Sequence, residues 1–415
     1  MAGPLEGIHA VEWAAYANSP LVGVMLGDFG ADIVKIEERG VGEPLRGMRT
    51  MHGTKLNIGG GKKAPGINAA VENTNRNKRS ISLDLKKEKG REIAHKLIEK
   101  ADVFYTNYGQ TRATRVGLDY DTLSKINPQL VYSNNTGYGP RGPDCEARVF
   151  DTAAQARSGL MHAMGERNTP PSVAVGTPND TLGATMATLG ILAALVGRER
   201  KGIGQMTNTS LLGSAIWIQI INIQTALLRK QVREHMGMAR HLRTKPGNPL
   251  VNHYECSDGK WVALCEPPFM KYWGEFCEVM EIDEPEYVSL KMEDLRKGDT
   301  IERLVSFLDE LFATKPRDEW IGIYKQKGAK FVYAPVNEVN DLLTDPQVLE
   351  NNYFVDFDHP VVGPVKMVGS PVEFSKTPAK IRSAAPEYSQ HTEEILLELG
   401  YDWDEITKLQ DEEVI

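Results

Sequence analysis

Short apolar runs alternate with amphipathic segments over the first 130 residues of the chain. Short apolar runs are typical of buried strands, whereas apolar positions that recur every three or four residues predict helices. The alternation favours an α/β fold with a parallel sheet and helices on its faces. The predicted strands are Gly7–Ala14, Ala31–Glu37, Ile81–Leu85, Val103–Thr106 and Leu130–Ser133, and the predicted helices are Ser19–Gly30, Arg91–Ala101 and Tyr120–Ile126.

The remainder of the chain has a different pattern. Met48–Asn73 is rich in Gly, Lys and Asn without an apolar period, which predicts a long loop. Thr181–Val196 and Leu211–Leu228 are rich in apolar residues, so we expect two helices that are buried in the middle of the molecule or at a subunit interface. Composition then becomes basic and polar around Arg229–Lys245, which indicates a domain boundary.

Beyond that boundary the sequence predicts a hairpin and several helices. HYECSDGKWVALC reads as two strands around the turn Ser257–Gly259. The region after Asp341 has few strand signals and ends in a helix, with Thr392 as its N-cap and Gly400 as its stop. Two further helices are expected near Phe269–Met280 and Ile301–Phe312.

Length, charge and composition exclude some classes of protein. The 415 residues suggest about two to three domains. A net charge of −8 argues against a nucleic-acid partner. The N-terminus lacks a signal-peptide pattern, and no stretch looks long and apolar enough to cross a membrane, so we expect a cytoplasmic protein. The four cysteines and nine histidines show no metal-ligand spacing.

Glycines near the N-terminus invite comparison with nucleotide-binding folds. Gly23, Gly27 and Gly30 follow the spacing G-x-x-x-G-x-x-G, not G-x-G-x-x-G, although Glu37 stands where a ribose-binding acid would. We interpret these glycines as permitting close packing of a helix on the sheet. Gly61-Lys62 does not complete a P-loop.

Asp180 stands just before the predicted helix Thr181–Val196 and has two interpretations. It is either the helix N-cap or a carboxylate nucleophile that attacks an acyl group, with free N–H groups nearby for an oxyanion. Basic residues likewise form either a solvated face or phosphate contacts at the carboxyl ends of strands. These basic residues are Lys78, Arg79, Arg112 and Arg115.

Several motifs together resemble the class III coenzyme A-transferases, of the formyl-CoA transferase and carnitine CoA-transferase type. The similarity runs from about Gly7 to the end of the chain. Its motifs include LGDFGADIVKIE, NRNKRSISLDLK, ADVFYTNYGQTRATRVGLDYDTL, TGYGPRGP, FDTAAQARSG, GRERKGIGQ, APVNEVNDLLTDPQ and HTEEILLELGY.

The resemblance implies a Rossmann-like large domain built from both chain ends, residues 1–228 and 339–415. A smaller α+β domain, residues 229–338, would be inserted between them. It also implies an interlocked dimer, expected to be a homodimer, with a heteromer left open. Acyl-CoA and a carboxylic acid would be the substrates, with no bound prosthetic group or metal.

The resemblance also assigns roles to residues. Asp180 matches the catalytic aspartate, which forms an aspartyl anhydride and then an aspartyl–CoA thioester. Tyr138 would lie near the acyl site, and Tyr16 and Asn18 belong to the turn that borders it. The residues expected to contact CoA are Asn107, Tyr108, Arg115, Lys78 and Arg79.

Departures from the family pattern bear on the substrate. Formyl-CoA transferase carries Gln in the first turn, where Ala17 and Asn18 stand here, and its shielding glycine loop has no counterpart near Gly247. We therefore expect acids other than oxalate or formate. Leu264–Phe276 is more similar to the branch that uses aryl, 2-hydroxy or substituted succinic acids.

Two other functions stay open from the sequence. The alpha-methylacyl-CoA racemases share this fold but carry His where Phe150 stands, so a two-base proton exchange would lack one base here. The unusual first turn also suggests a non-catalytic CoA-binding subunit of a heteromeric transferase. The sequence does not identify the donor and acceptor acids.

Overall fold

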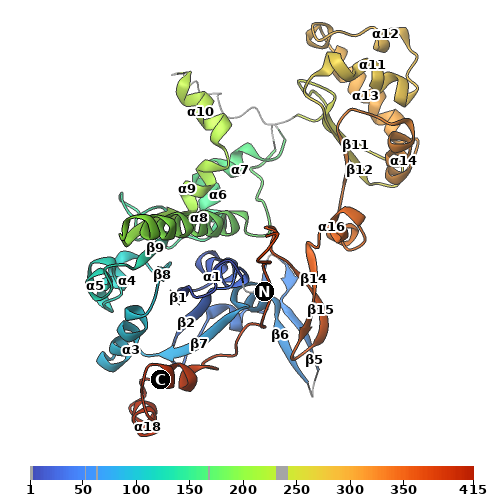
Figure 1. The fold of residues 1–415 in the computed structure, drawn as a ribbon. Helices are drawn as coiled ribbons and strands as arrows, with labels where there is room; N and C mark the ends of the chain where they lie inside the picture. The colour runs from blue at the N-terminus through green and yellow to red at the C-terminus, as the bar shows by residue number, and fades with distance from the viewer. Residues whose placement is uncertain (1–2, 52, 62–63, 167–168, 230–241) are drawn as a thin grey trace. The chain divides into compact units, whose positions relative to one another are not determined.

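The computed structural model describes residues 3–51, 53–61, 64–166, 169–229 and 242–415 (Figure 1). The chain divides into two compact units. The first comprises Met1–Met164, Ser172–Arg233 and Asn352–Ile415, and the second comprises Gly165–Pro171 and Glu234–Asn351. The first unit is therefore assembled from both ends of the chain, and residues 339–351 group with the second unit.

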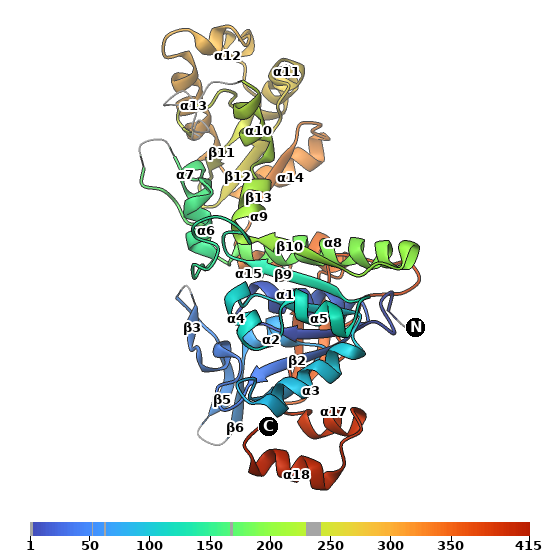
Figure 2. The same cartoon turned by 90° about the vertical axis from the view of Figure 1, so that its left-hand side faces the viewer.

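A six-stranded parallel sheet forms the centre of the first unit, as the alternating pattern predicts (Figure 2). The strand order is β10-β9-β8-β1-β2-β7, so β1 lies between β8 and β2. Along the chain, β2 and β7 come first, on one side of β1, and β8, β9 and β10 follow on its other side. The strands are β1 (His9–Trp13), β2 (Asp32–Glu38), β7 (Lys78–Leu83), β8 (Val103–Thr106), β9 (Val131–Thr136) and β10 (Gln205–Ser210).

Helices α1 (Asn18–Asp28) and α8 (Pro178–Lys201) pack together on one face of the sheet. A Cβ at Gly23 would lie 2.2 Å from the Tyr105 hydroxyl, and one at Gly27 would lie 2.9 Å from the Asn77 Cβ. These distances leave no room for a Cβ, so both positions require glycine. The structure confirms that these glycines serve helix packing.

The opposite face of the sheet is covered by α3 (Glu88–Glu99), α5 (Tyr120–Ile126), α17 (Thr392–Glu398) and α18 (Trp403–Asp411). Thr392 is the first residue of α17, and His391 is the N-cap residue. The Thr392 Oγ1 instead accepts a hydrogen bond from the Ser82 N–H at 3.1 Å. The prediction that Thr392 caps α17 is therefore wrong, because its hydroxyl ties the helix to β7.

Met48–Asn73 contains regular structure, so the prediction of a long loop is wrong. Two antiparallel hairpins form there, although their strands lack an apolar period because little of their surface is buried. Their strands are followed by a short helix. The elements are β3 (Thr50–Met51), β4 (Thr54–Lys55), β5 (Asn57–Gly61), β6 (Ala64–Asn68) and α2 (Ala69–Asn75).

The second apolar helix is also interrupted. α9 (Leu211–Trp217) and α10 (Ile220–Leu228) meet at a bend of 76°. None of the α10 side chains is buried in this single chain, so α10 does not pack in the middle of the molecule, and its place at a subunit interface stays a prediction. The sequence analysis expected no stretch long and apolar enough to cross a membrane. By length and composition alone, α8 and the bent pair α9–α10 each meet that condition. The alanines of α8, however, pack against α1.

The second unit is an α+β domain around a three-stranded antiparallel sheet. β11 (Val251–Glu255) and β12 (Trp261–Cys265) form the predicted hairpin, and β13 (Tyr333–Val336) completes the sheet. Aromatic side chains dominate its core; for example, Tyr254 stacks on Phe312 with ring centroids 4.7 Å apart. Its helices are α11 (Phe269–Met280), α12 (Pro285–Val288), α13 (Thr300–Phe312), α14 (Arg317–Lys327), α15 (Val339–Leu342) and α16 (Pro346–Glu350).

The C-terminal part contains a hairpin that the sequence pattern missed. β14 (Phe354–His359) pairs antiparallel with β15 (Gly363–Val368) before the chain returns to the sheet. Gly400 has a φ of 91° directly after α17, as expected for a helix stop. The remaining short helices of the first unit are η1 (Pro44–Gly47), α4 (Gln110–Arg115), α6 (Asp151–Arg157) and α7 (Leu160–Ala163).

Thr392→Val should lower the free energy of unfolding by about 1–2 kcal/mol, because the Ser82 N–H then loses its partner in a buried place. Urea unfolding measures this loss. The matched control is Thr407→Val, since the Thr407 hydroxyl only donates to the Trp403 carbonyl within an exposed helix. Equal losses in both variants would contradict the role of Thr392.

Candidate active site

The site lies at the carboxyl ends of β1 and β8, where the chain leaves neighbouring strands in opposite directions. Ligands of open α/β sheets bind at such points. Asn107, directly after β8, holds the loop after β1: its Nδ2 donates to the Ala15 carbonyl oxygen (2.7 Å), and its Oδ1 accepts from the Ala15 N–H (3.1 Å). The two loops are therefore fixed to each other.

A cavity of about 520 Å³ opens between these loops and the segment before α6. A smaller cavity of about 70 Å³ reaches Asp180. Because the two share lining residues, they form one channel with Asp180 at its inner end. The shared residues are Tyr16, Asn107, Thr136, Gly137, Val149 and Phe150.

Asp180 is the third residue of α8, and Thr177 is the N-cap residue, so the interpretation of Asp180 as a cap is wrong. The Asp151 side chain caps the N-terminus of α8 instead. Its Oδ2 accepts hydrogen bonds from the N–H groups of Asn179 (2.7 Å) and Asp180 (3.0 Å). These N–H groups are therefore not free for an oxyanion, contrary to the sequence expectation.

The surroundings of Asp180 favour its neutral form. Burial, followed by the negative charge of Asp151, raises the pKa of Asp180 to about 7. The carboxylate that forms near neutral pH is poorly solvated and hence more reactive than one in water. The Nδ2 of Asn18 donates to the Asp180 carbonyl oxygen at 3.1 Å, which fixes the first turn beside it.

Aromatic side chains form one wall of the inner channel. The rings of Tyr16 and Phe150 meet edge to face, with centroids 5.2 Å apart. Half of Phe150 is exposed (51%), although it is large and apolar. An exposed aromatic surface beside a reactive carboxylate is suited to an apolar group of a substrate.

The outer channel carries cations. The Tyr108 ring contacts Trp13, with centroids 4.5 Å apart, and the Arg112 guanidinium, which lies 3.8 Å from the Tyr108 centroid and 5.5 Å from the Trp13 centroid. Arg112 and Arg115 also line a neighbouring cavity of about 340 Å³, together with Lys86. This arrangement offers aromatic and cationic contacts to an anionic ligand.

A family model described as CoA-transferase family III matches residues 5–392. The chain belongs to this family. It is 32% identical to (R)-2-hydroxy-4-methylpentanoate CoA-transferase of Clostridioides difficile, covering 99% of each chain. It is 31% identical to cinnamoyl-CoA:phenyllactate CoA-transferase of Clostridium sporogenes, covering 98% of this chain and 95% of that one.

A solved structure agrees with the fold of this CoA-transferase. The CAIB/BAIF family protein from Brucella suis is 26% identical and superposes with a TM-score of 0.81, covering 96% of this chain and all of the other (100%). The α/β architecture with a parallel central sheet is thus shared, as the resemblance implied.

Some of the remaining predicted site residues lie away from the channel or have other partners. The Nζ of Lys78 is buried and donates to Glu12 (2.7 Å) and to the carbonyl oxygens of Pro20 (2.8 Å) and Thr74 (2.6 Å). All of its donors are used, so the predicted CoA contact of Lys78 is wrong in this structure. Glu37, the residue at the position of a ribose-binding acid, binds Arg46.

Arg79 and Tyr138 do not line the channel to Asp180. Arg79 pairs with Asp32 (2.7 Å) and with Glu398 (2.8 Å) near the other end of the strands, which leaves its guanidinium committed to the fold. The ring of Tyr138 lies under the Arg157 guanidinium, 4.2 Å from it. The residues that the structure gathers at the channel are Tyr16, Asn18, Asn107, Tyr108 and Asp180.

Asp151 is a site residue to which the sequence analysis assigned no role. It belongs to the motif FDTAAQARSG, but its hydrogen-bond partners lie 28 and 29 residues later, so local spacing does not indicate them. Among the residues described, no group of three or more His, Cys, Asp or Glu is placed to hold a metal ion.

Asp180→Asn should raise the free energy of unfolding by about 4 kcal/mol more at pH 8 than at pH 4. The pKa of Asp180 in the folded state, about 7, lies above its ordinary value of 3.8. The unfolded chain therefore loses this proton first, and wild-type stability falls as pH rises between these values. Asparagine avoids that loss.

Urea unfolding of wild type and variant at both pH values provides the measurement. In an Asp151→Asn background the effect should shrink, because the neighbouring negative charge is one of its two causes. An Asp180→Asn effect that is the same at pH 4 and pH 8 would rule out the raised pKa.

Proposed function

We propose that this protein transfers coenzyme A from an acyl-CoA donor to a free carboxylic acid, with Asp180 as the nucleophile. The single observation that carries the proposal is the position of Asp180, which lines the smaller cavity beside the main one and has its pKa raised to about 7. A carboxylate in that place meets the thioester of a CoA whose remaining length fills the channel.

In the proposed first half-reaction, an Asp180 carboxylate oxygen attacks the thioester carbonyl. The carbon–sulfur bond breaks, giving an acyl–aspartyl anhydride and the CoA thiolate. The thiolate attacks the aspartyl carbonyl, releasing the donor acid as its carboxylate and leaving an aspartyl–CoA thioester. No proton is consumed, and one thioester replaces another.

The second half-reaction reverses these steps with a new acid. Its carboxylate attacks the aspartyl–CoA thioester, and the thiolate departs from a second anhydride. Attack of that thiolate on the substrate carbonyl forms the new acyl-CoA and restores the Asp180 carboxylate. Both anhydrides hydrolyse readily, so the inner channel must exclude water.

The outer channel would bind the rest of CoA. Asn107 and Tyr108 line the main cavity, and Arg115 belongs to the adjoining cationic cavity. We assign the phosphates of the CoA nucleotide to Arg115 with Arg112 and Lys86, since guanidinium and ammonium groups bind phosphate strongly.

For the acid, we propose a 2-hydroxy or aryl acid. The relatives named for 2-hydroxy-4-methylpentanoate and for phenyllactate support this class. The aromatic wall of Tyr16 and Phe150 would receive an apolar side chain of this kind. Phe150 also argues against a racemase, because no imidazole stands at this position.

We also propose that the protein acts as an interlocked homodimer in the cytoplasm. Apolar side chains of α10 are exposed in the single chain, including Ile221 (79%) and Leu228 (73%). A surface of this kind is typical of one that a partner covers.

Asp180→Ala should abolish transfer, lowering kcat at least about 10³-fold, because no other group forms the covalent intermediate. The assay mixes a panel of acyl-CoAs and acids, with hydroxylamine added to trap the intermediate as an Asp180 hydroxamate for mass spectrometry. The control Asp356→Ala removes an exposed carboxylate that pairs only with Lys366 and should retain full activity.

Retained transfer by Asp180→Ala would refute the nucleophile. Wild-type protein that binds CoA, gives no hydroxamate and exchanges the α-proton of an acyl-CoA would favour a racemase. Activity that appears only after a partner chain is added would favour a non-catalytic subunit.

Arg115→Ala should weaken CoA binding by about tenfold, since one charge-assisted phosphate contact is lost. Binding of pantetheine, which lacks the nucleotide, should stay unchanged. Isothermal titration calorimetry gives both values. Arg303→Ala is the matched control, because Arg303 belongs to the second unit, where it pairs with Glu286. An equal effect of Arg115→Ala on CoA and pantetheine would contradict the assignment.

A further inference from the structure

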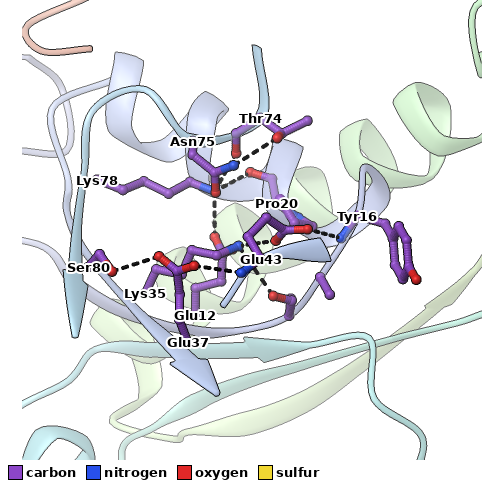
Figure 3. Close-up of polar contacts among 12 residues, drawn as sticks. Glu12, Tyr16, Pro20, Lys35, Glu37, Glu43, Thr74, Asn75, Lys78 and Ser80 are labelled. Carbon is purple, nitrogen blue, oxygen red and sulfur yellow. Dashed lines mark hydrogen bonds and ion pairs between the residues drawn. The ribbon is translucent and has the colours of Figure 1, made fainter. Parts of the chain in front are cut away.

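A cluster of charged side chains lies buried beneath the turn that follows β1 (Figure 3). At its centre, the Nζ of Lys35 donates to Glu12 and to Glu43, each at 2.7 Å. Lys35 is 1% exposed and Glu43 is 2% exposed. The cluster balances its charge with three carboxylates and three cations: Glu12, Glu37, Glu43, Lys35, Lys78 and Arg46.

Glu43 connects this cluster to the turn. While its Oε2 binds Lys35, its Oε1 accepts a hydrogen bond from the Tyr16 N–H at 2.9 Å. Lys35 in turn donates to the Ala14 carbonyl oxygen at 3.3 Å. Two buried charges therefore hold the main chain on both sides of Ala15, whose own N–H and carbonyl are held by Asn107.

The main chain of Tyr16 needs such support. Its φ is 65°, a left-handed conformation that costs a residue with a Cβ roughly 1 kcal/mol. Without its partner, the turn would relax toward an ordinary backbone. Tyr16 and Asn18 both line the inner channel, so relaxation would displace the wall opposite Asp180.

Burial makes the Glu43 contact more than a local hydrogen bond. Burial by itself would raise the pKa of Glu12, yet Lys35 and Lys78 hold it below its ordinary value, which indicates that these cations favour the carboxylate form of Glu12. Replacing Glu43 by a neutral residue would remove one of the two carboxylates that bind Lys35 and leave only Glu12, which Lys78 also binds, in a buried place. The cluster would then adjust, and the turn is attached to it at Ala14 and Tyr16.

We propose that Glu43 is a positioning residue of the transferase site: it holds Tyr16 in its left-handed conformation and thereby keeps the channel wall closed against water. This inference rests on the proposed function, because it concerns the protection of the aspartyl intermediates. Glu43 lies outside the inner cavity and touches no reacting atom.

Two variants test the proposal. Glu43→Gln removes the charge, and its single carbonyl oxygen can serve either Lys35 or Tyr16 but not both. Glu43→Asp keeps the charge but shortens the reach by one methylene. The control is Asp28→Asn, which also neutralises a buried carboxylate, one that binds Arg76 and Asn77 at the far end of α1.

Hydrogen exchange of the intact protein, followed by mass spectrometry, tests the contact without requiring activity. The peptide that contains Tyr16 should exchange at least about tenfold faster in both Glu43 variants than in wild type and in Asp28→Asn. An unchanged exchange rate in a folded Glu43 variant would overturn the proposal, whatever the protein catalyses.

The second readout is the fate of the intermediate. With an acyl-CoA and an accepting acid, both Glu43 variants should hydrolyse acyl-CoA at the expense of transfer, raising the ratio of hydrolysis to transfer about tenfold, while the Kd for CoA stays within threefold. Asp28→Asn should leave the ratio unchanged. A wild-type ratio in a Glu43 variant would overturn the positioning role, whereas loss of the proposed function would appear as wild-type protein that transfers nothing.

Discussion

The position of β1 between β8 and β2 is the constraint on which the site depends. Since the chain leaves β1 toward one side of the sheet and β8 toward the other, the two loops diverge at their carboxyl ends. A carboxylate, an aromatic wall and the outer cations line the crevice between them. Tyr16, after β1, and Asn107 and Tyr108, after β8, stand on the loops that this divergence exposes.

Two carboxylates in that crevice, Asp151 and Asp180, have different roles. Asp151 accepts hydrogen bonds from two N–H groups at the start of α8. Burial, and after it the charge of Asp151, raises the pKa of Asp180 to about 7. One carboxylate therefore serves the helix terminus, while the other faces the cavity near neutral pH in both of its forms.

The sequence predicted five of the six strands of the central sheet, because each of these five contains a short apolar run, and β8 was predicted to the residue. The pattern did not indicate β10 (Gln205–Ser210), because its residues are mostly polar. It missed β5 and β6, whose pairing rests on backbone hydrogen bonds in a Gly-rich stretch. The resemblance identified Asp180, but Asp151 and Glu43 find their partners 28 and 27 residues away along the chain. Such contacts have no signature in local spacing and appear only when the fold brings the segments together.

The return of the chain to β7, an edge strand of the sheet, has a consequence for synthesis. The Ser80 carbonyl oxygen accepts from the His391 N–H (2.9 Å), and the Asp84 N–H donates to the Val414 carbonyl oxygen (2.8 Å). Both partners are synthesised long after β7. Until then, the nascent chain exposes an uncovered sheet edge and part of its apolar core, which is a template for unwanted pairing. This part of the fold therefore cannot form until segments far along the chain have been synthesised.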